Sequence, residues 1–213
     1  MASWTSAFGR ACGVLLDTIV RWLALSRINP NVLTFMGLVV NTWAAILFGS
    51  ATAVTQRRLF FYAGLVIIGS GFFDLVDGAV ARANNRVTRF GAFFDSVVDR
   101  YSDASQFLGL LIFYARGDRF FYVVLTAFVM VSAIMVSYTR ARAESLIGSC
   151  RVGFMERPER LVLVIIGALF NRMAPVLWVI AVLSTLTVIH RMRYTWTRTQ
   201  DPPNTAAKAG QAA

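Results

Sequence analysis

The sequence predicts an all-α integral membrane protein with six transmembrane helices, preceded by an N-terminal amphipathic helix that lies in the membrane interface. Three observations lead to this prediction. Of the 213 residues, 57% are hydrophobic and only 15% are charged, whereas soluble domains carry about a quarter charged residues. The apolar residues form runs of about 20, the length that crosses a bilayer. The net charge of +10 comes almost wholly from arginine, because Lys208 is the only lysine.

This composition excludes a disordered chain and a solvated nucleic-acid-binding domain, so no nucleic acid partner is expected. Arginine has a planar guanidinium group that suits phosphate and carboxylate. A basic, apolar and arginine-rich chain therefore indicates anionic lipid or phosphate-bearing partners in a bilayer.

Residues 1–27 are expected to form the interfacial amphipathic helix. Apolar residues recur there at helical spacing, and tryptophans are typical of headgroup depth. Charged residues interrupt every run that is long enough to span the bilayer; they are Arg10, Asp17 and Arg21. The alternative is a soluble helix that packs on the rest of the chain.

Six apolar segments follow, and with their connections they form one predicted domain, residues 28–199. The segments are 32–54, 59–81, 92–115, 120–138, 161–170 and 174–189. The fifth is short for a span unless it begins within 156–160. Residues 200–213 are polar and contain two adjacent prolines, so a disordered tail is expected there.

With the amino terminus in the cytoplasm, this topology puts most of the 21 basic residues on the cytoplasmic side. The positive-inside rule then favours both termini in the cytoplasm. The expected location is the cell membrane, crossed several times, with the active site on the cytoplasmic face.

Four aspartates stand where the second apolar segment ends and the third begins. Asp74 and Asp77 are three residues apart, and Asp95 and Asp99 are four apart, so each pair lies on one face of its helix. The short connection predicts antiparallel neighbours, which brings the four carboxylates together. Because a carboxylate inside a bilayer costs about 2.5–3.5 kcal/mol on insertion scales, such a cluster is a functional candidate.

Four ionised carboxylates at short range repel one another unless some are protonated or a cation lies between them. Oxygen ligands suit Mg²⁺, Mn²⁺ or Ca²⁺, and a Mg²⁺ ion held by carboxylates leaves positions for substrate phosphate oxygens. Gly78 and Gly91 permit close approach of a bulky ligand, and Arg82 can pair with its phosphates. The alternative is a helix boundary at which the aspartates simply pair with nearby arginines.

The chain resembles the CDP-alcohol phosphatidyltransferases over about residues 30–196. The eight fixed positions of their signature are matched by Asp74-x2-Asp77-Gly78-x2-Ala81-Arg82-x8-Gly91-x3-Asp95-x3-Asp99. The resemblance implies a membrane enzyme with six transmembrane helices, usually a homodimer. Such an enzyme transfers a phosphatidyl group from a CDP-linked lipid, here CDP-diacylglycerol, to an alcohol and releases CMP.

The resemblance also implies roles for individual residues. Asp74, Asp77 and Asp95 match the aspartates that hold divalent metal, Mg²⁺ or Mn²⁺, on the diphosphate. Asp99 matches the aspartate that helps to bind metal and takes the proton of the acceptor hydroxyl. The CDP-lipid-binding residues implied are Asn31, Val32, Leu33, Thr34, Gly78, Arg82 and Thr88.

Several polar residues on the later segments bear on the acceptor. More arginines gather on the expected cytoplasmic side than CMP requires, which predicts an acceptor with its own phosphate. Any one of these arginines could instead mark topology or pair with anionic headgroups. The candidate phosphate-binding residues are Ser137, Arg140, Arg142, Arg160 and Arg191.

Two runs resemble the bacterial branch of the family that uses inositol 1-phosphate as acceptor and makes phosphatidylinositol phosphate. They are Ser-Tyr-Thr-Arg-Ala-Arg-Ala-Glu at 137–144 and Glu-Arg-Pro-Glu-Arg-Leu at 156–161. Relatives often carry lysine at position 140. Glycerol 3-phosphate is the alternative acceptor. A cation transporter is a third hypothesis, less favoured because transporter sites lie near the bilayer midplane between repeats and the sequence has no visible repeat.

Overall fold

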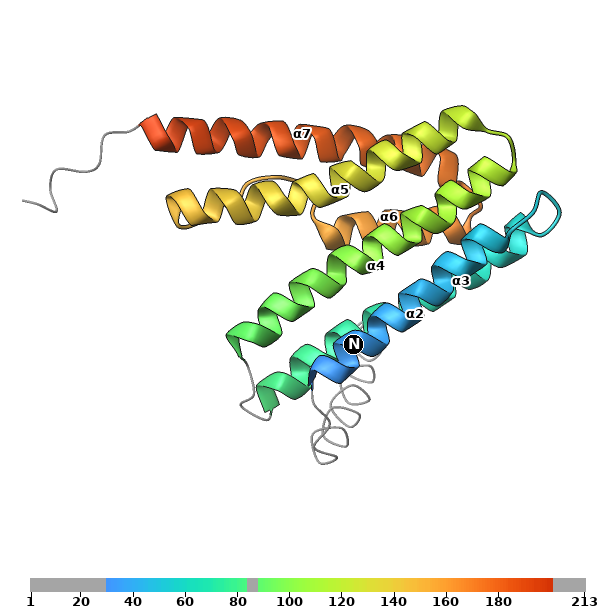
Figure 1. Cartoon of the computed structure of the whole chain (residues 1–213), viewed down its shortest axis with the longest axis horizontal. Coiled ribbons are helices and arrows are strands. Elements are labelled where there is room, and N and C mark those ends of the chain that lie inside the picture. The colour runs from blue at the N-terminus through green and yellow to red at the C-terminus, as the bar shows by residue number, and fades with distance from the viewer. Residues whose placement is uncertain (1–29, 84–87, 201–213) are drawn as a thin grey trace, which may run out of the picture.

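The computed structural model describes the backbone of residues 30–83 and 88–200, and the side chains of residues 31–71 and 88–200. The predicted interfacial helix at 1–27 and the predicted tail beyond residue 200 lie outside the described residues. Within them the fold is all-helical, as predicted, with no strand (Figure 1). The helices are α2 (Pro30–Ser50), α3 (Gln56–Ala83), α4 (Arg89–Arg116), α5 (Phe120–Ile147), α6 (Arg157–Leu169) and α7 (Met173–Gln200).

The described part of the chain contains three helical stretches that are long and apolar enough to cross a membrane. They are Asn31–Ser50, Phe120–Ile147 and Met173–Gln200. The helix α6 has 13 residues, so it is about 20 Å long, less than the bilayer core of about 30 Å. It begins at Arg157, inside the range 156–160 in which the fifth apolar segment is expected to begin if it spans the bilayer. Six transmembrane helices remain a prediction.

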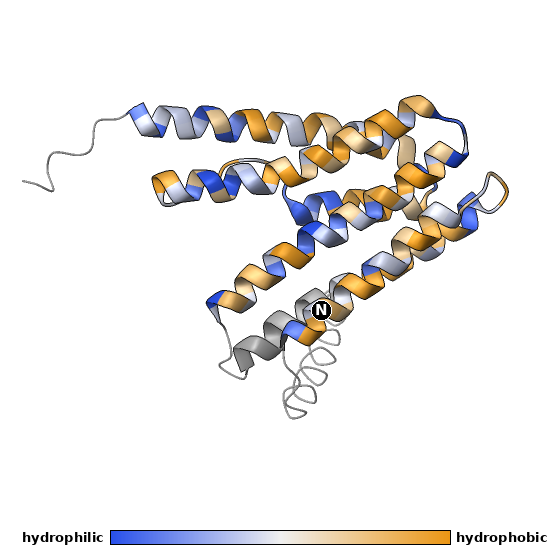
Figure 2. Ribbon diagram, in the orientation of Figure 1, coloured by the Kyte–Doolittle hydropathy of each residue, from blue (hydrophilic) through white to orange (hydrophobic). Residues whose placement is uncertain are grey.

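Two helices run further than their apolar segments. The sequence predicts that the fourth and sixth segments end near residues 138 and 189, but α5 continues to Ile147 and α7 to Gln200. The added turns carry many polar residues (Figure 2), although the last two residues of α5 are the apolar Leu146 and Ile147. The continuation of α5 has a local cause, because arginine, alanine and glutamate are good helix formers. The residue that follows the helix is Gly148, whose φ of 78° suits a helix C-terminus.

The helices pack in a connected series. The helix α2 lies against both α3 and α4, α5 lies between α4 and α7, and α6 contacts α3 and α7. The chain leaves α3 and enters α4 at the same end of the molecule, so these two helices are antiparallel, as predicted (Figure 1). Among the described residues, α3 and α4 both pack on α2, and they also touch directly where the rings of Phe60 and Phe113 lie with their centroids 4.9 Å apart.

A close approach and a buried polar network fix α2 against its neighbours. A Cβ atom added at Gly109 of α4 would overlap the backbone of Ala45 in α2, and small residues permit such contact between membrane helices. Asn41 of α2 accepts a hydrogen bond from Gln106 Nε2 at 2.6 Å and donates one to Ser70 Oγ of α3. Because buried polar groups require partners, this network sets the register of the three helices next to the aspartate motif.

Candidate functional site

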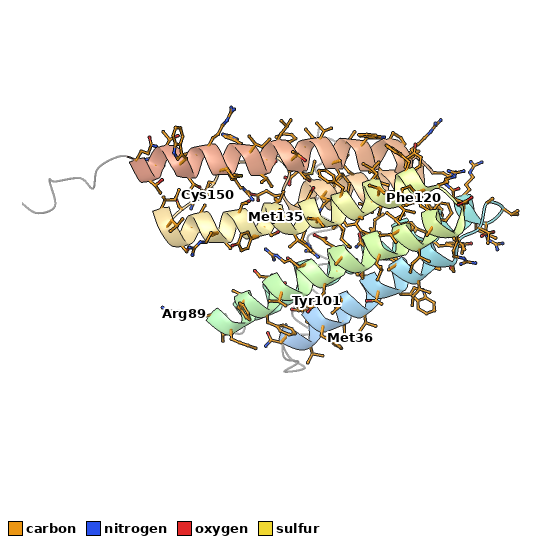
Figure 3. All side chains as sticks on the ribbon, turned by 45° about the horizontal axis from the view of Figure 1, so that its top comes forward. Met36, Arg89, Tyr101, Phe120, Met135 and Cys150 are labelled. Atoms are coloured by element: carbon orange, nitrogen blue, oxygen red, sulfur yellow. The ribbon has the colours of Figure 1, made fainter. Side chains whose placement is uncertain are left out.

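A cavity of about 470 Å³ opens between α4, α5, the start of α6 and α7. Figure 3 shows the side chains of these helices, with Tyr101 and Met135 marking the stretches of α4 and α5 beside the cavity. Four carboxylates and four arginines line it together with small and apolar residues. These charged residues are Asp99, Asp103, Glu144, Glu156, Arg100, Arg140, Arg157 and Arg191.

Three carboxylates form a single row along α4, and two of them, Asp99 and Asp103, line the cavity. Asp95, Asp99 and Asp103 are each four residues apart, so they lie on one face of α4. The start of this helix is fixed by Thr88, whose hydroxyl accepts a hydrogen bond from the backbone N–H of Gly91 at 2.9 Å. Sequence reasoning gave no role to Asp103, although the four-residue spacing could have included it.

The start of α6 supplies arginines to this row. Arg157 Nη1 lies 3.0 Å from Asp99 Oδ1, and Arg157 Nε lies 3.8 Å from Asp103 Oδ1. One turn later, Arg160 Nη2 donates to Asp103 Oδ2. Only 2% of Arg160 is exposed. The two arginines therefore fasten α6 to α4, and Arg160 lies behind Asp103 rather than on the cavity wall.

A second charged group lies on the opposite wall. Arg140 Nε contacts Glu144 Oε1 at 3.0 Å, and Arg140 Nη1 contacts both oxygens of Glu156 at 3.0 and 3.1 Å. Arg191 Nη2 reaches Glu156 Oε1 at 2.7 Å. The other nitrogens of Arg191 donate to Val152 O at 2.8 Å and Val136 O at 2.5 Å. Glu156 thus joins α5 and α7 at the cavity.

Of the five residues proposed to bind acceptor phosphate, the structure brings together three. Ser137, Arg140 and Arg191 line the cavity. Arg142 instead lines a separate hollow of about 300 Å³ between the ends of α5 and α7, which Arg191 also borders. Sequence reasoning assigned no role to Arg157 or Glu156, although both belong to the run 156–161.

The residues implied for CDP-lipid binding lie partly outside the described side chains. Asp74, Asp77, Gly78 and Arg82 belong to the last turns of α3, and their side chains are outside the described residues. The first turns of α2 carry Asn31, Val32, Leu33 and Thr34.

Two of the residues expected to bind the CDP-lipid, Asn31 and Thr88, lie together at the start of α4. A Cβ atom added at Gly91 would lie 3.0 Å from Thr88 Oγ1 and 3.5 Å from Asn31 Oδ1. The start of α2 therefore borders the start of α4, and a glycine stands at their junction.

The described part of the aspartate motif offers two carboxylates of the kind that a divalent cation requires. Asp95 and Asp99 lie one turn apart, are half-buried and offer the oxygen ligands that Mg²⁺ and Mn²⁺ prefer. Among the described side chains, no group of three or more potential metal ligands occurs; Asp74 and Asp77 fall outside that set. Two arginines compete with a cation for Asp99: Arg157 Nη1 lies 3.0 Å from Oδ1, and Arg100 Nη1 lies 4.0 Å from Oδ2.

The apolar helices and the charged cavity beside an aspartate pair define a helical membrane protein with a polar site at a helix junction. Residues 27–189 match the CDP-alcohol phosphatidyltransferase family, and the chain belongs to this family. The predicted enzyme class is confirmed, and the cation transporter hypothesis is set aside.

Curated relatives share about a third of their residues with this chain. An archaetidylinositol phosphate synthase of Pyrococcus horikoshii is 36% identical over 83% of this chain and 88% of its own length. A phosphatidylinositol phosphate synthase of Mycobacterium tuberculosis is 36% identical over 90% of this chain and 88% of its own length.

Solved structures share the fold. The crystal structure of the Mycobacterium tuberculosis phosphatidylinositol phosphate synthase with CDP-DAG bound has a TM-score of 0.76 and 31% identity, covering 85% of this chain and 94% of that chain. A structure of the same enzyme in complex with manganese and citrate has a TM-score of 0.73 and 32% identity, covering 85% and 89%.

Proposed function

We propose that this protein transfers the phosphatidyl group of CDP-diacylglycerol to inositol 1-phosphate, forming phosphatidylinositol phosphate and releasing CMP. The observation that carries the proposal is the cavity in which Arg140 and Arg191 face the aspartate row of α4. The names of the relatives from Pyrococcus horikoshii and Mycobacterium tuberculosis support the inositol phosphate acceptor.

In this proposal Asp99 removes the proton of the acceptor hydroxyl. An alcohol is a poor nucleophile at neutral pH, and a carboxylate on the cavity wall can take its proton as the oxygen attacks. The new P–O bond joins the acceptor to the lipid phosphate, and the P–O bond to CMP breaks. Arg157, at 3.0 Å from Asp99 Oδ1, orients this carboxylate.

Asp74, Asp77, Asp95 and Asp99 are proposed to hold the divalent cation. When bound, Mg²⁺ or Mn²⁺ would neutralise the diphosphate charge and so make CMP a better leaving group. The manganese in the solved relative supports a divalent cation. The proposed CDP-lipid site consists of Asn31, Val32, Leu33, Thr34, Gly78, Arg82 and Thr88, and it is supported by the meeting of Asn31 and Thr88 at Gly91.

The acceptor phosphate is proposed to bind Ser137, Arg140 and Arg191, because these residues line the cavity opposite the aspartate row. Arg160 is proposed to support this site indirectly, because it holds the carboxylate of Asp103 at the cavity wall. The proposed setting is a homodimer in the cell membrane with a single catalytic domain of six transmembrane helices, residues 28–199. Both termini and the cavity would face the cytoplasm.

A panel of acceptors tests the proposal. Detergent-purified protein receives CDP-diacylglycerol and Mg²⁺ with inositol 1-phosphate, inositol, glycerol 3-phosphate or serine, and CMP release and product mass are measured. We expect the highest kcat/KM with inositol 1-phosphate. A preference for glycerol 3-phosphate would keep the chemistry and change the acceptor, whereas efficient use of unphosphorylated inositol would contradict a phosphate-binding cavity.

A further inference from the structure

Four charged side chains alternate in sign along one wall of the cavity. Their order is Glu144, Arg140, Glu156 and Arg191, with contacts of 3.0, 3.0 and 2.7 Å between successive members. Two carboxylates therefore neutralise the two arginines that we assign to the acceptor phosphate. Both arginines contact an anionic side chain of the protein itself, the carboxylate of Glu156.

Glu156 is the bridging anion in this row. Its Oε1 atom accepts from Arg140 Nη1 at 3.0 Å and from Arg191 Nη2 at 2.7 Å. Two guanidinium groups that converge on one carboxylate present the same donors that would hold the oxygens of a phosphate monoester. The contact of Glu144 is different, because it reaches Arg140 alone.

The contacts of Glu156 are exchangeable, whereas the position of Arg191 is fixed. The side chains of Glu156 and Arg140 are 36% and 41% exposed, so both are open to the cavity. The side chain of Arg191 is only 1% exposed, and it is held by the carbonyl groups of Val136 and Val152. If Glu156 moved away, Arg191 Nη2 would stay in place and face the cavity.

We propose that Glu156 is a specificity-determining residue, which occupies the acceptor-phosphate position until the phosphate of the acceptor displaces it. This inference rests on the proposed function and names how the same site selects a phosphorylated alcohol. A phosphate monoester carries about −1.5 to −2 charges at pH 7 and replaces the single charge of Glu156 on both arginines. An unphosphorylated polyol offers only neutral hydroxyl groups, so displacement by it would leave a buried arginine without a counter-charge.

The displaced carboxylate has other partners within its own helix. Glu156 is the N-cap residue of α6 and forms a capping box with Glu159. The N-terminal end of a helix carries partial positive charge and unsatisfied N–H groups. Glu156 can therefore leave the arginines without losing every compensating interaction.

The variant Glu156→Gln tests the proposal, because it keeps the shape of the side chain and removes its charge. The probe is inorganic phosphate, measured as a competitive inhibitor against inositol 1-phosphate. Removal of a unit charge next to the phosphate position should lower the inhibition constant for phosphate by about ten-fold. The KM for inositol 1-phosphate should fall similarly, and the KM for CDP-diacylglycerol should stay within about two-fold.

Glu159→Gln is the matched control. This substitution removes the same charge from the same helical turn. The amide oxygen of the glutamine can still accept the backbone N–H of residue 156. The native carboxylate of Glu159 forms no ion pair among the described residues. We expect its inhibition constant for phosphate to match that of the wild type. A similar fall in both variants would overturn the specific role of Glu156.

An unchanged or raised inhibition constant in Glu156→Gln would also overturn the proposal, because it would mean that the carboxylate only holds the arginines in place. If this variant fails to fold, Glu156→Asp, whose shorter side chain cannot bridge both arginines, should shift the constant in the same direction. The rise in Tm with added phosphate gives a second readout that needs no turnover. Because this shift reports phosphate binding alone, it tests the role of Glu156 even if inositol 1-phosphate is not the acceptor.

Discussion

Arg157 Nη1 lies 3.0 Å from Asp99 Oδ1, so the first residue of α6 contacts the carboxylate of α4 to which we assign proton removal. The same stretch of chain carries Glu156, which contacts Arg140 and Arg191. The start of α6 therefore connects the aspartate row with the proposed phosphate-binding arginines. A shift of this short helix would change the contacts of Asp99 and those of the two arginines at the same time.

Asp99→Asn should reduce turnover by about 10²–10⁴-fold, the usual effect of losing a general base. The amide is nearly isosteric but cannot take the proton of the acceptor hydroxyl. The measurement is kcat for CMP release by protein that elutes normally in size-exclusion chromatography. Activity within a few-fold of the wild type would remove Asp99 from the proposed mechanism.

Chelation should stop the reaction, and added Mg²⁺ or Mn²⁺ should restore it. The reason is that the proposed site uses carboxylate oxygens, which bind hard divalent cations. CMP release is measured in excess EDTA and again after each metal is added back. Ca²⁺ serves as a comparison cation of the same charge, and undiminished activity in EDTA would contradict an exchangeable metal.

Arg140→Ala should raise the KM for inositol 1-phosphate by about ten- to a hundred-fold, because a hydrogen bond to a charged group contributes about 1.5–3 kcal/mol. The KM for CDP-diacylglycerol should change little. Arg142→Ala provides the comparison, since Arg142 lies two residues away and lines the separate hollow. An equal rise in both variants would support the sequence-based assignment of Arg142 to the same phosphate.

Asp103→Asn should lower the free energy of unfolding by about 3–5 kcal/mol, because it leaves the buried Arg160 without its charged partner. The measurement is thermal unfolding in detergent. Arg172→Ala is the control, since Arg172 is exposed on the turn before α7. Equal stability of Asp103→Asn and the wild type would show that the Asp103–Arg160 pair does not hold α6 against α4.

Gly109→Ala should destabilise the protein by about 1–3 kcal/mol, because the added methyl group meets the backbone of Ala45 in α2. Gly69→Ala is the control, since a Cβ atom at that position has no neighbour within 4 Å. It should be neutral or stabilise α3 by up to about 1 kcal/mol, because alanine favours helix. The Tm values of the two variants are compared in the same detergent.

The all-helical class and the aspartate motif follow from the amino-acid sequence alone. Apolar runs separated by polar turns are read directly from the chain, and residues three or four apart share a helix face because the helical period is local. For the same reason the continuation of the row to Asp103 was predictable. The family signature at 74–99 also needed no structure.

Which charged side chains meet depends on the packing of the helices. Arg140 and Arg142 lie on different faces of α5, and the packing of α7 and α6 determines that Arg140 lines the cavity. Arg191 reaches Glu156 across 35 positions of sequence, and its burial against the carbonyl groups of Val136 and Val152 makes it a fixed donor. Such contacts depend on how the helices pack and not on spacing along the chain. The hydropathy of the sequence shows where apolar segments begin and end, but it does not show which segments pack against one another.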